Sequence, residues 1–187
     1  MLPKILFWVI ALNCLITDQA AQQRNYNVEL RQFICKCLKS RPVQQLECFF
    51  KKLETNRYYA TGFVMLNQQL DKNLDVQVKF NIGSGKKIIK FLDVKLNICD
   101  TLQRGASTPV IRRIIIELFK CSNLPRKCPI KPNFLFNASY ILDDSYFPTY
   151  FPPSLDVNFT VDFYDNHQKF AILLLQGSIV PKTKINK

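Results

Sequence analysis

Residues 74–82 read LDVQVKFNI, so apolar and polar side chains alternate along the whole stretch. Successive side chains of a β-strand point to opposite faces, and a period of two therefore predicts a strand with one buried face. Residues 83–87 (GSGKK) are typical of a turn, and the alternation resumes over residues 92–98. We expect these residues to form an antiparallel hairpin.

The second half of the chain repeats this pattern. Residues 134–142 and 155–163 carry apolar side chains at every second position, which predicts two more half-buried strands. The polar triplet 165–167 is expected to turn the chain into a last strand, 170–180, whose continuous apolar run suggests burial on both faces. The pattern predicts a mostly β protein built as an antiparallel β-sandwich. Weaker strand candidates are residues 27–38 and 58–69.

One segment departs from the period of two. Thr108 and Pro109 form a good N-cap and first-turn pair, and apolar side chains then recur at helical spacing as far as Phe119. This spacing predicts one amphipathic helix over residues 109–120. A membrane-active helix is the alternative, but a helix of about twelve residues is marginal in isolation, which favours packing on the sheets.

The N-terminus has the pattern of a targeting segment. Lys4 precedes an apolar stretch, residues 5–16, that is shorter than the roughly 20 residues a membrane-spanning helix needs. We expect residues 1–21 to be a cleaved signal peptide, with an uncleaved signal anchor as the alternative. Residues 22–187 are then expected to form a single secreted, extracellular domain.

Cysteine usage agrees with an oxidising compartment. Six cysteines remain once Cys14 leaves with the signal peptide, and an even number in a secreted chain predicts three disulfides. Zinc is the rival explanation, but Cys35-x-Cys37 and Cys121-x6-Cys128 lack the usual metal-ligand spacing. We expect neither a metal nor a cofactor.

Two sequons point to N-glycosylation of the same secreted product. They begin at Asn137 and Asn158, and neither has proline in the middle position. Both asparagines fall on the polar face of a predicted strand, where an attached glycan can point into solvent. We expect both asparagines to be glycosylated.

The formal net charge of the chain is +12. Such a charge suggests nucleic acid as a partner, but a secreted protein more often meets anionic membranes, glycans and other proteins, and the basic residues are scattered. We expect no nucleic-acid partner. The alternative function is that of a cationic extracellular protein that docks on an anionic membrane, glycan or receptor surface.

The sequence offers few groups for catalysis. His167 is the only histidine, lies in a predicted turn and has no serine or cysteine nucleophile signature around it. The acidic residues are dispersed along the chain, although a carboxylate pair of the kind used in glycoside hydrolysis need not be adjacent in sequence. We expect no enzymatic activity.

The inward faces of the predicted sandwich are rich in aromatic residues. These side chains can pack solidly, or they can line a cavity for an apolar ligand if the sheets splay apart. The linker 143–154 adds aromatic residues where loops normally have few, so they either cap the core or form a rim. The candidate ligand-binding residues are Phe80, Phe134, Phe136, Tyr140, Phe159 and Phe163 inside, with Tyr146, Phe147, Tyr150 and Phe151 at the rim.

The stretch 94–164 resembles a known family. The residues that carry the resemblance are 96–100 (LNICD), the predicted helix, and 121–129 (CSNLPRKCP), in which Asn123 and the Cys128-Pro129 pair are the most distinctive. The stretch is similar to an insect-expanded family of small secreted proteins of unknown function that is related to the ML lipid-recognition domain and similar to the chemosensory CheB proteins of flies.

The resemblance implies an immunoglobulin-like, ML-like β-sandwich whose interior holds a hydrophobic small molecule or lipid between the sheets. It implies a non-enzymatic carrier of a lipid or pheromone-type ligand, with a cell-surface receptor or channel as a further partner and peripheral contact with membranes. The family pattern suggests disulfides Cys37–Cys48 and Cys99–Cys128. Cys35 and Cys121 are additions to that pattern and, left over together, are expected to pair.

Overall fold

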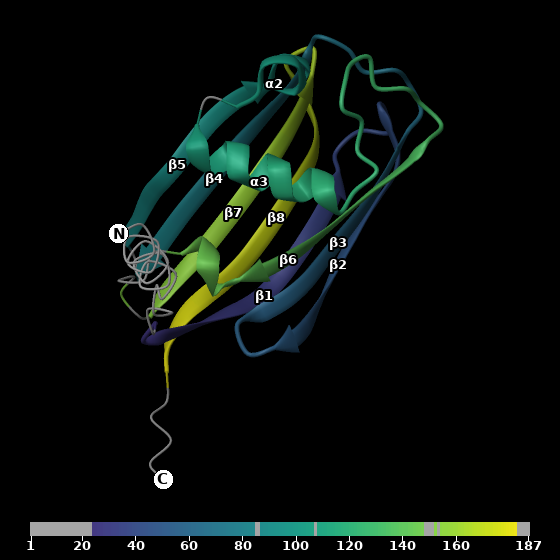
Figure 1. Ribbon diagram of the computed structural model, residues 1–187. Helices are drawn as coiled ribbons and strands as arrows, with labels where there is room; N and C mark the ends of the chain where they lie inside the picture. The colour runs from purple at the N-terminus through teal and green to yellow at the C-terminus, as the bar shows by residue number, and fades with distance from the viewer. Residues whose placement is uncertain (1–23, 85–86, 107, 148–151, 153, 183–187) are drawn as a thin grey trace, which may run out of the picture.

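A computed structural model of the chain describes residues 24–84, 87–106, 108–147, 152 and 154–182 (Figure 1). Two antiparallel sheets contain all the named strands, with strand orders β1-β8-β7-β4-β5 and β2-β3-β6. The mostly β antiparallel sandwich expected from the sequence is therefore confirmed. The strands are β1 (Tyr26–Cys37), β2 (Val43–Glu54), β3 (Arg57–Leu66), β4 (Leu74–Ser84), β5 (Lys87–Asn97), β6 (Leu135–Asp143), β7 (Leu155–Asp165) and β8 (Gln168–Pro181).

The predicted signal peptide, residues 1–21, lies outside the described residues. The single-domain organisation of residues 22–187 stays a prediction.

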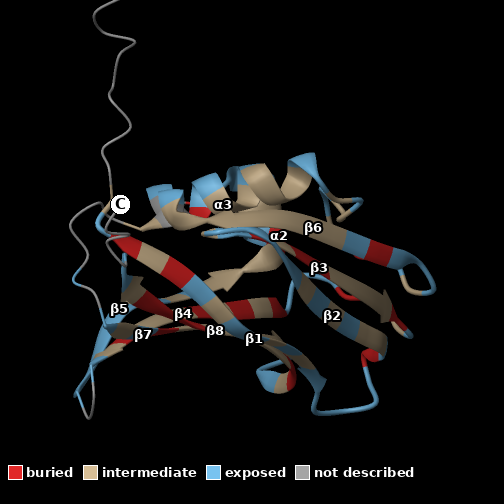
Figure 2. Ribbon diagram, turned by 90° about the horizontal axis from the view of Figure 1, so that it is seen from below, coloured by how far each residue is buried: buried red, intermediate tan, exposed pale blue. Residues whose placement is uncertain are grey.

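The helix α3 (Pro109–Lys120) has the bounds that the sequence predicted. Thr108 occupies the N-cap position, but its side chain makes no capping hydrogen bond. The helix start is therefore favoured by Pro109, whose fixed φ suits the first helical turn. Ile111 and Ile115 pack against Val76 and Val78 of β4, which places α3 on the inner face of the five-stranded sheet. α3 runs across the strands of this sheet (Figure 1), on the side that also carries the three-stranded sheet (Figure 2).

The predicted hairpin over residues 74–98 is confirmed as β4 and β5, with one difference at its end. Ile98 does not extend the strand alternation but begins a short helix, α2 (Ile98–Arg104). The side chain of Asn97 accepts a hydrogen bond from the backbone N–H of Asp100 and so caps this helix. A helix this short shows too few turns for periodicity to reveal it, and the sequence predicted only α3.

β2 was missed by the sequence analysis, while the two weaker strand candidates are confirmed as β1 and β3. Bulges between Val43 and Gln45 and between Lys52 and Glu54 interrupt the period of two in β2. As an edge strand, β2 also has many exposed side chains. Its apolar residues therefore do not alternate cleanly.

The last strand, β8, was expected to be buried on both faces, and this expectation is wrong for residues 171–175, although Ser178 on the outer face is buried. Ile172 and Leu174 lie opposite Asp162 and Thr160 of β7 on the outer face of the sheet, where both remain half-buried. The β7–β8 turn is as predicted: Asn166 and His167 have φ of 48° and 65°, the left-handed values a two-residue hairpin turn requires.

Two disulfides join the layers among the described residues. Cys99–Cys128 is present as expected and ties α2 to the segment that leads into β6. The expected Cys37–Cys48 bond is wrong, because Cys48 bonds to Cys35, with the two Cα atoms 5.8 Å apart. Cys35 and Cys37 both lie on the inner face of β1, about 6.6 Å apart along the strand. Because a disulfide requires its two Cα atoms to lie within about 7 Å, a cysteine displaced by this step cannot form the bond to Cys48 in place of its neighbour.

The expected Cys35–Cys121 bond is also wrong. Cys121 follows α3, and its carbonyl accepts a hydrogen bond from the backbone N–H of Ser139 on β6. β6 lies at the opposite edge of the three-stranded sheet from β2, to which Cys35 is bonded. Both Cys37 and Cys121 are exposed free thiols.

Substitution of Cys35 distinguishes the observed disulfide from the expected one. The Cys35–Cys48 bond closes a loop of sequence separation 13, so C35S is expected to lower the free energy of unfolding by about 3 kcal/mol. C37S is the matched control and should change it by less than about 0.5 kcal/mol, because it removes an exposed thiol. Chemical denaturation of both variants under oxidising conditions measures the difference; a larger loss in C37S would contradict the observed pairing.

The outer face of the five-stranded sheet carries a compact charge network. Asp162 on β7 is 2% exposed and forms two ion pairs on its Oδ2 atom. The Nζ atom of Lys79 lies 2.9 Å away and that of Lys169 lies 3.1 Å away. Burial alone raises the pKa of Asp162, but the hydrogen bonds and charges of the two lysines outweigh it and hold the pKa below its ordinary value. The hydrogen bond to Asp162 likewise raises the pKa of Lys79.

The lowered pKa makes this network a pH-dependent source of stability. At neutral pH we expect D162N to lower the free energy of unfolding by about 2 kcal/mol. Because the folded pKa lies below the unfolded value of about 3.9, the contribution is complete above that pH and is lost as pH falls through the folded pKa. The gap between wild type and D162N should therefore close below about pH 4. D156N removes an exposed pair with Arg31 and serves as the control, with a loss under about 0.5 kcal/mol.

Candidate functional site

The inner face of the five-stranded sheet presents a continuous apolar row. Phe80 on β4 lies opposite Phe159 on β7, which lies opposite Leu175 on β8, which lies opposite Phe33 on β1. The neighbouring row runs through Val78, Val161, Leu173 and Cys35, whose disulfide crosses to Cys48 on the inner face of β2. We call the first row the aromatic row. Because the neighbouring row is bonded to the three-stranded sheet, the aromatic row faces the space between the two sheets.

The aromatic row is only half-buried. Phe80, Phe159, Leu175 and Phe33 all keep part of their surface in contact with solvent. Around them the fully buried residues divide into three clusters: Phe80 packs against the one containing Tyr26 and Ile179, while Phe159 packs against the one under α3. The buried interior therefore consists of separate clusters, and the half-buried aromatic row runs between them.

The three-stranded sheet contributes Phe136 and Tyr140 to the facing surface. Phe136 is buried and lies opposite Val64, and Tyr140 lies opposite Ala60, on the face of β6 that also carries Ala138. Ala138 shares its cross-strand row with Gly62 and Cys48. Since Cys48 reaches across to β1, these predicted residues do point toward the first sheet.

The rim residue Phe147 lies against the interior as expected. Its ring centroid is 6.1 Å from that of Phe80, which in turn meets the edge of Phe91 on β5 at 5.5 Å. The side chain of Tyr146, and Tyr150 and Phe151 altogether, lie outside the described residues. The linker therefore supplies at least one aromatic contact to the aromatic row.

Phe134 does not belong to the interior. It precedes β6 and is 51% exposed, with its ring centroid 4.9 Å from that of Phe136. The alternation extends through residue 134 in the sequence, but the chain enters the sheet only at Leu135, where pairing with Met65 begins. Of the candidate interior residues, Phe163 packs between the inter-sheet cluster and the α3 cluster.

Sequence reasoning missed Phe33 and Phe91 as neighbours of this site. Phe33, Cys35 and Cys37 do alternate, which could have placed Phe33 on the inner face of a strand. Phe91 lies at the β-bulge between β4 and β5, where Phe80 pairs with Leu92 and Asn81 with Lys90. The extra residue puts Phe91 out of phase with the alternation of residues 92–98, and no sequence signal marks it.

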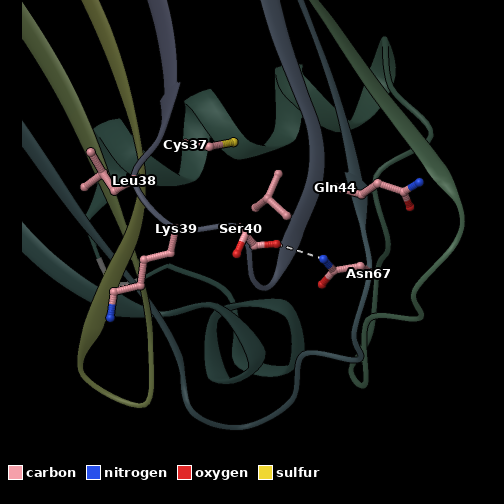
Figure 3. Close-up of a pocket in the computed structure, with 7 residues that line it drawn as sticks. Cys37, Leu38, Lys39, Ser40, Gln44 and Asn67 are labelled. Atoms are coloured by element: carbon pink, nitrogen blue, oxygen red, sulfur yellow. Dashed lines mark hydrogen bonds between the residues drawn. The ribbon is translucent and has the colours of Figure 1, made fainter.

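A separate, open pocket of about 480 Å³ lies at the far end of β1 (Figure 3). Asn67 donates a hydrogen bond to the carbonyl of Ser40 at 2.9 Å, and Lys39 turns away to donate to Gln168 at 2.6 Å. Although Cys37 is an exposed residue, desolvation by neighbouring atoms raises the pKa of its thiol at the edge of the pocket. Its mixed polar lining includes none of the candidate ligand residues: Cys37, Leu38, Lys39, Ser40, Val43, Gln44 and Asn67.

Asn123, which the resemblance singled out, holds a chain segment against the open edge of β6. Its side chain accepts a hydrogen bond from the backbone N–H of Asn137 at 2.6 Å and donates one to the carbonyl of Leu135 at 3.0 Å. One amide side chain thus satisfies two strand-edge groups that water would otherwise hydrogen-bond. Its role in the fold is structural.

Within the part of the chain that the structure describes, no group of three or more His, Cys, Asp or Glu side chains is placed to hold a metal ion. In the same residues, no helix has both the length and the apolar character needed to cross a membrane.

Residues 72–155 match the model of a family described as a protein of unknown function (DUF1091). The matched region contains β4, β5, α2, α3, β6 and the Cys99–Cys128 bond, together with Phe80 and Phe147. It covers less than half of the chain, and it agrees with the resemblance to a family of unknown function. No curated protein matches this chain.

The two sequons lie on outer sheet faces, with different accessibility. Asn137 is exposed on the edge strand β6, whereas Asn158 is half-buried on β7, where its Oδ1 accepts a hydrogen bond from Gln176 at 2.8 Å. We expect glycans at both positions in protein secreted from eukaryotic cells, with the higher occupancy at Asn137. Mass spectrometry of wild type, N137Q and N158Q before and after enzymatic deglycosylation measures this. If N137Q loses as much glycan mass as wild type on deglycosylation, the prediction is contradicted.

Proposed function

We propose that this chain is a secreted, non-enzymatic carrier of an apolar ligand, a lipid or lipid-like molecule that lies along the aromatic row between the two layers. The observation that carries the proposal is the partial exposure of Phe80, Phe159 and Leu175 at inward-facing positions. In a close-packed core such side chains lose nearly all contact with water. Apolar surface that remains open inside a sandwich is a natural place for an apolar ligand.

The chemistry of the inner face supports an apolar ligand over a charged one. The inward positions are all apolar from Leu74 to Ile82 of β4 and from Leu155 to Phe163 of β7, and the charged residues within these stretches lie on the outer face. The exception is Asp165, which lies opposite Leu74 at the end of β7. A charge placed against such a surface would lose its hydration without gaining a partner. The resemblance to a family of unknown function that is related to the ML lipid-recognition domain, whose better-known members hold lipids between the sheets, supports the same class of ligand.

Secretion is supported by two features of the chain. Cys35–Cys48 and Cys99–Cys128 are disulfides that link separate elements, and structural disulfides persist in oxidising compartments. The apolar stretch 5–16 behind Lys4 has the composition of a signal peptide. An extracellular carrier for a chemosensory or similar ligand fits both features.

Replacing Leu175 by Trp tests whether the interior is open. If the aromatic row borders ligand space, L175W fills that space, weakens binding of the neutral probe N-phenyl-1-naphthylamine by about tenfold, and leaves stability within about 1 kcal/mol. L174W on the outer face of the same strand is the matched control and should bind the probe like wild type. Fluorescence titration and chemical denaturation provide both measurements.

A solid core predicts the opposite result. The extra ring would then overpack the interior and cost about 1–3 kcal/mol or more in L175W, and wild type would not bind the probe. Mass spectrometry of organic extracts of the natively purified protein gives an independent readout. Protein that is consistently empty, together with a destabilised L175W, would reject the proposal.

A further inference from the structure

The edge strand β5 exposes an unusual concentration of large apolar side chains. Ile88, Ile89 and Phe91 are 72%, 53% and 58% exposed, the three highest values for large apolar side chains among the described residues. Lone exposed apolar residues are common on protein surfaces, but three within four positions form a patch. We call these three residues the β5 patch.

The β5 patch lies where no strand of the structure covers it. β5 is the last strand of the five-stranded sheet, and it pairs only with β4 among the described elements. Ile88 and Ile89 are adjacent in the strand and so point to opposite faces, which wraps the apolar surface around the sheet edge. The patch therefore lies on both faces of this sheet edge, and we call the edge with its exposed apolar side chains the apolar ridge.

Basic side chains flank this ridge. Lys87 and Lys90 are both exposed, and Lys87 makes no ion pair with any residue that the structure describes. Lys90 pairs with Asp93 at 2.9 Å, a contact that its exposed ammonium can exchange for another anion at little cost. The chain as a whole carries a net charge of +12, which attracts the hairpin toward negatively charged surfaces.

We propose that the β5 patch docks the protein on the surface of a bilayer that contains anionic lipid. Apolar side chains that enter the interface while neighbouring lysines meet the lipid phosphates are the combination that binds peripheral proteins to such membranes. An acidic protein surface would satisfy the lysines but would leave the apolar ridge to be matched by a complementary groove. The apolar ridge and its basic flanks fit a deformable anionic bilayer.

The β5 patch also connects to the candidate ligand site. The ring of Phe91 meets Phe80 of the aromatic row at 5.5 Å, and Phe80 contacts Phe147 at 6.1 Å. Docking through this edge would bring the bilayer next to the end of the aromatic row, so that an apolar ligand passes between membrane and protein without crossing water. This transfer role rests on the proposed function, whereas docking itself does not.

Vesicle sedimentation tests the docking. Wild type should bind phosphatidylcholine–phosphatidylserine vesicles and bind pure phosphatidylcholine vesicles at least about tenfold more weakly, and added salt should weaken the binding because it screens the lysines. I88S/I89S should bind the mixed vesicles about tenfold more weakly than wild type. L38S/L135S is the matched control: it replaces two exposed apolar residues at the strand ends farthest from the β5 patch and should bind within about twofold of wild type.

Three results would overturn the docking: no binding of wild type to the mixed vesicles, equal binding to both kinds of vesicle, or wild-type binding by I88S/I89S. Fluorescence titration of the same samples with N-phenyl-1-naphthylamine keeps this separate from the proposed function. Probe binding without vesicle binding rejects only the docking surface, and vesicle binding without probe binding rejects only the ligand site.

Discussion

The unequal width of the two sheets is the constraint on which the rest of this structure depends. Five strands present an apolar inner face, and only three strands lie opposite. Burial of apolar surface contributes roughly 25 cal/mol per Å², so the uncovered part of the wide sheet needs another cover. α3 supplies it over β4 and β5, through Ile111 and Ile115. The two disulfides hold the unlike layers together, Cys35–Cys48 at one edge and Cys99–Cys128 beside α2.

A cover made of a sheet and one helix does not seal the wide face evenly. The inter-sheet cluster around Phe136 and the helix cluster around Ile111 are each well buried, and the aromatic row between Phe80 and Phe159 is not. Outside, the wide sheet is stabilised by charges, with Asp162 held between two lysines. The same sheet thus separates an ionic outer face from an apolar inner face, and the candidate ligand site follows from that separation.

Residues that act locally could be predicted well. The alternation of residues 74–82 and the position of Pro109 each indicate the local structure of neighbouring residues, and both predictions agree with the observed β4 and α3. Prediction failed where partners far apart in sequence decide the outcome. Cys35 and Cys37 are equivalent by alternation, and only the register of β1 against the second layer selects Cys35. Phe91 and β2 were missed because bulges shift the period of two, and a bulge is set by the neighbouring strand.

By itself, the sequence determined the fold class, the positions of most strands, the helix over residues 109–120 and the faces of the strands whose side chains alternate cleanly, such as β4. These depend on the direction in which neighbouring side chains point, which the backbone alone dictates. Only the tertiary structure decided which cysteines bond, which aromatic residues meet in a row, and that Phe134 lies outside the sheet. Those outcomes depend on cross-strand register and on how far one layer covers the other, and both are settled only when distant parts of the chain pack together.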